Sequence, residues 1–332
     1  MKAIRAGVGG IVVDDTGLVP KLGAGEALVR PIRAAIAEPD LDIASGTRNF
    51  TGVMGHQFVG TVEQIDARPG REDKQWLGKR VVGTASVACG KCDLCRAGLS
   101  SHCASRQVLG LLGRDGCFAE RFAIPVANLV EVPRQVSDDA AAFAEPLGRA
   151  LHAAHILRVE GKPYVTVLGD GVGALLAAQV MARLNASVRL LGWQPDKFGL
   201  CERWGIKHRH ADEVGRRHDQ DIVVECTGAA RGTSLALSLA RPRAKVVLCS
   251  RGISLPTSGS TDSPGADLGP AIDAELELLG ASSCSMAESV QMLATNRIET
   301  APLITSRGRL SEGPALLARA RDPSQLRVMI DL

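Results

Sequence analysis

The sequence is poor in aromatic residues and has no long apolar run. Its 332 residues include three Trp, one Tyr and six Phe, so a large pocket lined by aromatic rings is not expected. No run approaches the roughly 18 apolar residues of a membrane-spanning helix. Residues 1–15 are broken by glycines and end in two acids, which predicts a strand rather than a signal peptide. We therefore expect a cytoplasmic protein with no membrane partner.

The sequence also lacks a strong charge imbalance. It has 39 Lys and Arg against 36 Asp and Glu, a net charge of +3, and the basic residues are scattered. This balance does not favour a nucleic-acid partner. Hydrophobic residues make up 45% and charged residues 23%, which is typical of a globular protein. At about 150 residues per domain, the length predicts two domains.

Nine cysteines without an export signal are expected to be thiols or metal ligands rather than disulfides. Four of them lie close together: Cys89, Cys92, Cys95 and Cys103. Four thiolates on a glycine-containing loop match a closed, structural zinc site, one zinc per chain in the segment 89–103. An iron–sulfur cluster has similar spacing but usually a Pro after its fourth Cys, where this chain has Ala104. The others are interpreted as buried thiols: Cys117, Cys201, Cys226, Cys249 and Cys284.

The pattern along the chain changes after Pro163. The preceding part is rich in Gly, Val and Pro, with strands predicted at 27–32, 59–65 and 79–82. Beyond it, predicted strands (164–168, 188–191, 221–226 and 245–249) alternate with predicted helices (173–185, 195–204 and 232–240). This alternation predicts a doubly wound parallel sheet. A Ser/Pro/Gly-rich surface loop is expected at 254–269, and a last strand, 326–330, is expected to return to the first domain.

A glycine-rich turn follows the first of these strands, with the sequence Gly169-Asp170-Gly171-Val172-Gly173-Ala174. It fits the G-x-G-x-x-G/A turn that holds a dinucleotide pyrophosphate: the first Gly allows the tight turn, the second a close backbone approach, and Ala174 close helix packing. The next helix offers free N–H groups to the phosphates. The alternative is an ordinary tight strand-to-helix turn, which favours Gly too.

The acid that normally binds the adenosine ribose is missing from its usual place. An acid is expected about 20 residues after the first Gly, but the chain has Leu191-Gly192-Trp193-Gln194 there, and Asp196 comes late. Because no carboxylate would repel a 2′-phosphate, and Arg189 and Lys197 are near in sequence, we favour NADP(H) weakly over NAD(H). Alternatively, both cations are simply solvated.

Together, Gly55-His56 followed by Phe58-Val59-Gly60, the four-cysteine segment and the later glycine-rich turn resemble the zinc-dependent alcohol dehydrogenases of the medium-chain dehydrogenase/reductase superfamily. Further similar stretches begin at Gly78, Gly116, Glu145 and Asp221.

The resemblance implies an α/β protein with a GroES-like, β-rich catalytic domain at 1–146 and a Rossmann domain at 147–295. Residues 296–332 would return to the catalytic domain. It also implies a homodimer or homotetramer and a small alcohol or carbonyl substrate. Trp193, Lys197 and Thr227 join the glycine-rich turn as predicted cofactor contacts.

The chain departs from this family where a catalytic zinc would bind. The family's Cys-Gly-Thr/Ser-Asp-type stretch reads Ala37-Glu38-Pro39-Asp40, so a metal ligand and a proton-relay hydroxyl are both missing. Its Gly-His-Glu reads Gly55-His56-Gln57, with a neutral amide in place of a carboxylate. These changes predict a centre without catalytic zinc.

The residues left for this centre are His56, Glu145, Asp40 and Glu38. Our main hypothesis is an NAD(P)(H)-dependent oxidoreductase in which His56, Glu38 or Glu145 replaces zinc as electrophile or proton donor. One alternative is a catalytically impaired, cofactor-binding protein that acts as a redox sensor or assembly partner. Another is a rebuilt zinc site on His56, Glu145 and Glu38 or Asp40. His56 is equally interpretable as a core histidine, and Asp40 as a loop-capping acid.

Overall fold

The computed structural model describes residues 1–184, 186–215, 217–250 and 267–332. The chain divides into two compact units, Met1–Glu145 with Met286–Leu332, and Pro146–Ser285. The expected Rossmann domain extended to residue 295. Helix α9 (Met286–Ala294) instead belongs to the first unit, because it contacts α3 (Asp138–Ala141) and β11 (Leu129–Glu131).

The first unit is built on three antiparallel or mixed sheets. The largest has seven strands in the order β11-β6-β5-β3-β19-β18, with β10 also paired to β3. The smaller sheets are β2-β1-β4 and β7-β8-β9. Besides β11, the strands are β1 (Ala3–Gly7), β2 (Gly10–Asp14), β3 (Glu26–Ala35), β4 (Gly52–Val53), β5 (Gln57–Asp66), β6 (Arg80–Gly83), β7 (Ser86–Val87), β8 (Gln107–Leu109), β9 (Gly113–Arg114), β10 (Phe122–Pro125), β18 (Ile304–Arg309) and β19 (Arg327–Asp331).

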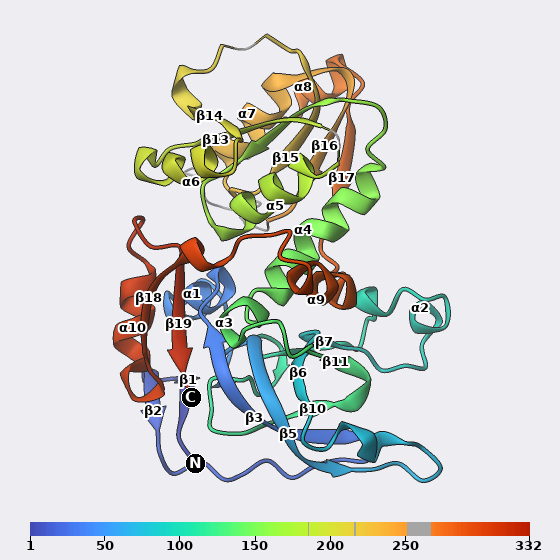
Figure 1. Ribbon diagram of the computed structural model, residues 1–332, viewed down its shortest axis with the longest axis vertical. Coiled ribbons are helices and arrows are strands. Elements are labelled where there is room, and N and C mark those ends of the chain that lie inside the picture. The colour runs from blue at the N-terminus through green and yellow to red at the C-terminus, as the bar shows by residue number, and fades with distance from the viewer. Residues whose placement is uncertain (185, 216, 251–266) are drawn as a thin grey trace. The chain divides into compact units, whose positions relative to one another are not determined.

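Short helices connect these strands. Besides α3 and α9 they are α1 (Glu38–Ala44), α2 (Asp93–Arg96), α10 (Gly313–Ala320), the start of α4 (Ala144–Leu157), and five 3-10 turns at Asp73–Trp76, Ser100–His102, Val126–Asn128, Ala301–Leu303 and Leu310–Glu312. The core includes Ile4, Phe118, Phe122 and Leu316, and an edge-to-face contact joins the rings of Phe122 and Phe58 at 4.7 Å. As expected, the last strand, β19, belongs to this unit: it runs antiparallel to β3 (Figure 1).

The second unit is a doubly wound sheet of six parallel strands, in the order β14-β13-β12-β15-β16-β17 (Figure 1). The strands are β12 (Tyr164–Leu168), β13 (Ser187–Gly192), β14 (Lys207–His210), β15 (Gln220–Glu225), β16 (Ala240–Leu248) and β17 (Glu277–Gly280). The helices are α5 (Val172–Ala182), α6 (Phe198–Arg203), α7 (Ala230–Leu239), α8 (Gly269–Asp273), the rest of α4, and 3-10 turns at Pro195–Lys197 and Ala211–Glu213. The strand order reverses between β12 and β15, as in Rossmann folds. In such folds, ligands usually bind at the point of reversal.

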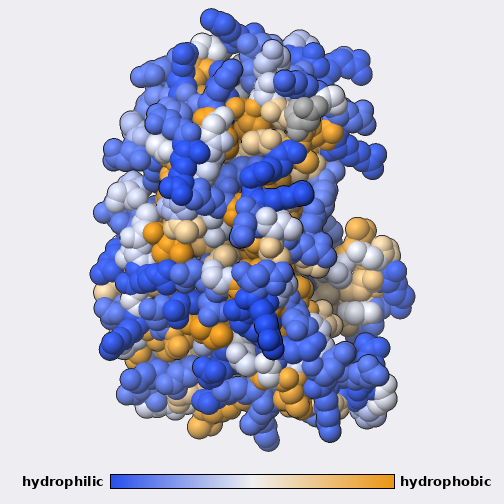
Figure 2. Space-filling view, viewed as in Figure 1, coloured by the Kyte–Doolittle hydropathy of each residue, from blue (hydrophilic) through white to orange (hydrophobic). Residues whose placement is uncertain are grey.

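The predicted α/β architecture is confirmed, and the strand at 164–168 has the predicted bounds. Strand β14 was not predicted, since its sequence Lys-His-Arg-His has no apolar residue. The expected loop at 254–269 lies mostly outside the described residues. Within these residues, no helix combines the length and apolarity needed to cross a membrane. The face drawn in Figure 2 is mainly hydrophilic, with small apolar patches.

Candidate functional site

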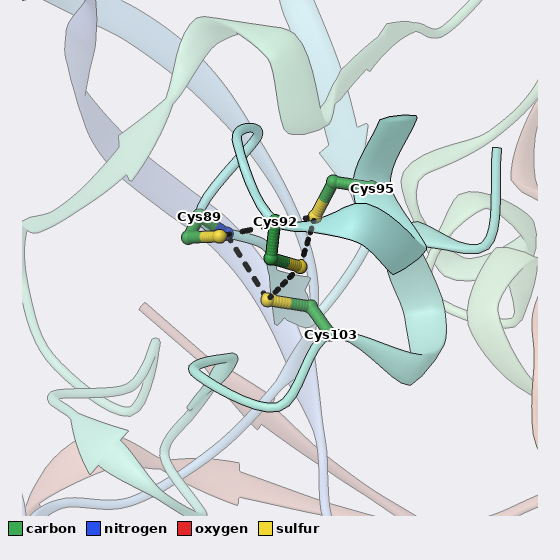
Figure 3. A group of neighbouring side chains, drawn as sticks. All are labelled: Cys89, Cys92, Cys95 and Cys103. Carbon is green, nitrogen blue, oxygen red and sulfur yellow. Dashed lines mark hydrogen bonds between the residues drawn. The ribbon is translucent and has the colours of Figure 1, made fainter. Parts of the chain in front are cut away.

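The four clustered cysteines converge in a lobe of the first unit (Figure 3). Their sulfur atoms all lie within 4.8 Å of one another, and the S–S separations include 3.5 Å for Cys92–Cys95, 3.8 Å for Cys92–Cys103 and 4.0 Å for Cys89–Cys95. Tetrahedral zinc with bonds of about 2.3 Å separates its ligand sulfurs by roughly 3.8 Å. The arrangement therefore fits a closed Cys₄ zinc site.

The lobe favours a thiolate at Cys89, whereas burial raises the pKa of Cys95 to about 12. The N–H groups of Lys91 and Cys92 donate to the Cys89 sulfur and lower the pKa of that thiol to about 6. The N–H of Cys89 in turn donates to Cys103 Sγ at 3.4 Å. Among the described residues, this is the only group of three or more His, Cys, Asp or Glu side chains arranged to hold a metal.

A second polar group lies at the start of β5. Gly55 has a φ of +93°, and a Cβ there would lie 2.2 Å from the Phe118 ring, so only glycine fits before His56. His56 is 4% exposed, and its Nδ1 lies 3.8 Å from Asp40 Oδ1. That distance is too long for a hydrogen bond, so the two side chains are neighbours without a direct bond, and neither atom has another hydrogen-bond partner among the described residues.

Asp40 has a structural role of its own. Its Oδ2 accepts a hydrogen bond of 2.9 Å from the N–H of Ala37 at the start of α1. Pro39 lies in the first turn of this helix, where a missing N–H is tolerated. Asp40 thus caps the start of α1 and also lies beside His56. Ala37, also buried, brings no metal ligand to this group.

Glu145 is held by the residue that replaces the family's carboxylate. Gln57 Nε2 donates to Glu145 Oε2 at 2.7 Å, and the side chains are 4% and 8% exposed. An ionised glutamate in place of Gln57 would be an acceptor only and could not donate this bond. The substitution therefore converts a potential pair of metal-binding carboxylates into a satisfied hydrogen bond.

A buried cation, Arg327, completes this group and was not predicted. Its Nη1 donates to Ile36 O at 2.8 Å, and its guanidinium lies over the Phe143 ring at 5.4 Å. Full burial lowers the pKa of Arg327 to about 10, while the negative charges of Glu145, Asp40 and Glu38 oppose this shift. Its only sequence signal is one basic residue directly before the apolar run Val328–Ile330 of β19.

The four predicted reaction-centre residues are only partly brought together. His56 and Asp40 are neighbours, Glu145 bonds to the residue after His56, and Glu38 is exposed at the first position of α1. Among the described residues these side chains do not form a metal-holding group. The set does not fit a rebuilt catalytic zinc, and we derive no reaction step through one.

The glycine-rich turn joins β12 to α5 at the point where the strand order reverses. Gly169 has a φ of +116°, and a Cβ there would lie 3.3 Å from the Ala174 Cβ, so the helix packs tightly on the turn. Gly171 caps the start of α5, and Gly173 is exposed with open space where a Cβ would be. Buried Val172 anchors this first helical turn.

The other predicted cofactor contacts surround this turn. Asp170 Oδ2 accepts from the N–H of Trp193 at 2.6 Å and of Gln194 at 2.9 Å, and Asp170 Oδ1 lies 3.9 Å from Lys197 Nζ. The methyl carbon of Thr227 would be 3.5 Å from a Cβ on Gly169. Burial lowers the pKa of Lys197, while Asp170 opposes this.

Arg189 does not belong to this site. It is the third residue of β13, three residues before the strand ends at Gly192, and its Nη2 donates to Thr166 Oγ1 at 3.1 Å. At about 3.3 Å per residue this is roughly 10 Å from the carboxyl end. The argument for NADP(H) thus loses this cation, because Arg189 lines a cavity that includes no residue of the glycine-rich turn.

Comparisons with known proteins agree with this architecture. Residues 23–134 match the alcohol dehydrogenase GroES-like domain. The L-threonine 3-dehydrogenases of Mesorhizobium japonicum and Rhizobium rhizogenes are 35% and 32% identical over 64% of this chain. The chain spans 65% of the length of these relatives.

Two solved structures have the same fold. A zinc-binding dehydrogenase from Sinorhizobium meliloti bound to NADP has a TM-score of 0.86 and 26% identity, covering 100% of this chain and 99% of its own. Galactitol-1-phosphate dehydrogenase from Escherichia coli has a TM-score of 0.86 and 22% identity, with 100% of both chains covered. With the GroES-like match and the Rossmann unit, these similarities support an alcohol dehydrogenase-like protein of the medium-chain dehydrogenase/reductase type.

Proposed function

We propose that the chain is an NAD(P)(H)-dependent oxidoreductase that interconverts a small alcohol and its carbonyl compound without a zinc ion at the reaction centre. One observation carries the proposal: a buried, charged centre is retained in a chain that also keeps a dinucleotide-binding turn, although the centre has lost its metal ligands. In this centre Gln57, the residue after His56, donates a hydrogen bond to Glu145. The charge of Glu145 in turn interacts with that of Arg327.

The second unit supplies the cofactor site of this proposal. The N–H groups at the start of α5 would hold the pyrophosphate, and the flanking loops would contribute Trp193, Lys197 and Thr227. A nicotinamide cofactor bound there would supply the hydride acceptor or donor. We retain a weak preference for NADP(H), because Asp170 is engaged by two backbone N–H groups and Lys197 is the cation beside it.

The first unit supplies the polar groups for the substrate. Arg327 is the fixed positive charge, and its buried Nε has no acceptor among the described residues. A guanidinium stabilises the negative charge that develops on a substrate oxygen during hydride transfer. His56 is the group that takes the hydroxyl proton in oxidation and returns it in reduction. Gln57 positions Glu145, whose negative charge helps to hold Arg327 in place.

The cysteine lobe holds one structural zinc in this proposal, and the assembly is a homodimer or homotetramer. Apolar Leu94 and Leu99 are 38% and 48% exposed in or beside the lobe, which is compatible with a subunit contact there.

The test is a panel of small alcohols and carbonyl compounds, including L-threonine and polyols, assayed with NAD⁺, NADP⁺ and the reduced cofactors. Metal content is measured on the same preparation. We expect turnover with about one zinc per chain, and loss of turnover in His56→Ala with cofactor binding retained. Cofactor binding without turnover of any compound would favour the redox-sensor alternative, and about two zinc ions per chain would refute the zinc-free centre.

A further inference from the structure

A cavity lies in the Rossmann unit, and its lining includes no residue of the glycine-rich turn. Its volume is about 820 Å³, and its lining includes Arg189, Lys207, Arg209 and Arg217. Arg189 on β13 is the register partner of Lys207 on the edge strand β14, so both side chains leave the same face of the sheet. Arg209 follows two residues after Lys207 and shares that face.

The guanidinium groups of this cavity influence one another. Burial lowers the pKa of Arg189; Asp219 opposes that shift, and the charges of Arg209 and Arg217 add to it. The acidic residues of the lining only partly neutralise the positive charge of the cavity. Asp219 Oδ1 accepts from Gln220 Nε2 at 2.6 Å, and Glu202 lies 3.2 Å from His208 Nε2.

Arg189 is incompletely satisfied within the described residues. Its Nη2 donates to Thr166, but its Nε is buried and has no acceptor there. An unpaired buried N–H of a charged group is costly. Three guanidinium groups within electrostatic range of one another are also unfavourable unless an anion lies between them. The clustering of guanidinium groups is explained by a ligand that brings negative oxygen atoms to the cavity.

We propose that this cavity binds a small molecule bearing a phosphoryl group, with the phosphoryl oxygens among Arg189, Arg209 and Arg217. The guanidinium fork matches phosphate geometry better than an ammonium does. The volume lies in the range of small-molecule sites, about 300–1,000 Å³. Glu202 and Glu213 also line the cavity, so the rest of the ligand carries hydroxyl groups rather than further negative charge. The site does not depend on the proposed dehydrogenase activity.

The test uses inorganic phosphate and ribose 5-phosphate as probes, with ribose as the uncharged comparison, in calorimetric titrations of the full chain. Ribose 5-phosphate should bind with salt-dependent affinity, and ribose should not bind. R209Q/R217Q removes two exposed guanidinium groups and should weaken binding at least about tenfold. D219N removes the carboxylate next to Arg189 and should tighten binding.

R243Q is the matched control, because Arg243 is 83% exposed in the same unit and lies 3.9 Å from Glu275. It should leave the affinity unchanged. Binding that is absent, that survives R209Q/R217Q, or that falls equally in R243Q would overturn the proposal. Circular dichroism checks that each variant is folded, and the opposite effect expected of D219N cannot arise from loss of structure.

Discussion

The hydrogen bond between Gln57 and Glu145 gives a sharp test of the reaction centre. The substitution Gln57→Glu restores the residue type of the family and places a second carboxylate 2.7 Å from Glu145 Oε2, in a position where both side chains are buried. Because ionised carboxylates only accept hydrogen bonds, the bond is lost unless one of the two is protonated. We expect the variant to be less stable than the wild type at neutral pH.

The cost follows from the geometry. Two unit charges 2.7 Å apart repel by about 6 kcal/mol at an effective dielectric constant of about 20. Taking up one proton avoids this repulsion, and protonating an ordinary glutamate with a pKa of about 4.3 at pH 7 costs about 3.7 kcal/mol. The charge of Arg327 reduces the penalty further. We therefore expect a loss of about 2–4 kcal/mol at pH 7.

Urea unfolding at pH 7 and at pH 5 measures this effect. The folded variant holds a proton that its unfolded chain releases, so its deficit should shrink as the pH falls, by up to about 1.4 kcal/mol per pH unit. Q57E/E145Q exchanges the two groups, restores an amide–carboxylate pair and should recover most of the stability. Q64E is the control, because Gln64 is exposed on the same strand β5.

The buried contact between positions 57 and 145 would be refuted if the Q57E variant were as stable as the wild type at pH 7. It would also be refuted if the loss of stability did not depend on pH. Zinc is measured on the same sample, because a newly bound metal would hide the repulsion.

Three further outcomes are expected. Cys103→Ser should release the zinc of the lobe, seen by elemental analysis as a fall from about one ion per chain, with a lower unfolding temperature; unchanged zinc would contradict the Cys₄ site. Arg327→Met should destabilise the fold by about 3–5 kcal/mol in urea, because acidic groups lose a buried cation, whereas a loss near zero would mean that the charge is not coupled to them. The hydrogen bond from Arg307, with the charges of Arg307 and Arg33, lowers the pKa of Asp139. The Arg307–Asp139 pair therefore stabilises the fold near neutral pH and loses this effect as acid protonates Asp139. The gap between wild type and Asp139→Asn, at most about 1 kcal/mol for so exposed a pair, should close on acidification, and a constant gap would contradict this.

The features that could be predicted from the sequence are those fixed by neighbouring residues. The turn at Gly169 depends on local backbone geometry and on a small residue five positions later, and the cysteine lobe spans 15 residues from Cys89 to Cys103. The apolar strand 164–168 is buried from its second residue on, which is why a continuous apolar run marked its bounds. Strand β14 lies at the sheet edge, where burial does not impose a pattern, so its polar sequence gave no signal.

Contacts between distant residues could not be predicted in this way. The bond from Gln57 to Glu145 joins residues 88 positions apart, and the bond from Arg327 to Ile36 spans 291 positions. Sequence alone indicated that Gln57 is a poor metal ligand, but not which group would accept its amide N–H. Arg189 shows the opposite error, since proximity in sequence to the end of β13 suggested a role at the ribose that the direction of its side chain rules out.

The departures at positions 37 and 57 are physically linked. A divalent cation neutralises carboxylates that lie close together, so a centre that keeps such a cation tolerates two acids in contact. With Ala37 in place of a thiolate the ligand set is incomplete, and a glutamate at position 57 would face Glu145 without that compensation. Gln57 removes one negative charge and donates a hydrogen bond to the other acid, while Arg327 supplies a cation that no change in metal supply can remove. Under the proposed function, the centre is therefore rebuilt around a fixed organic charge rather than being a zinc site that has only lost ligands.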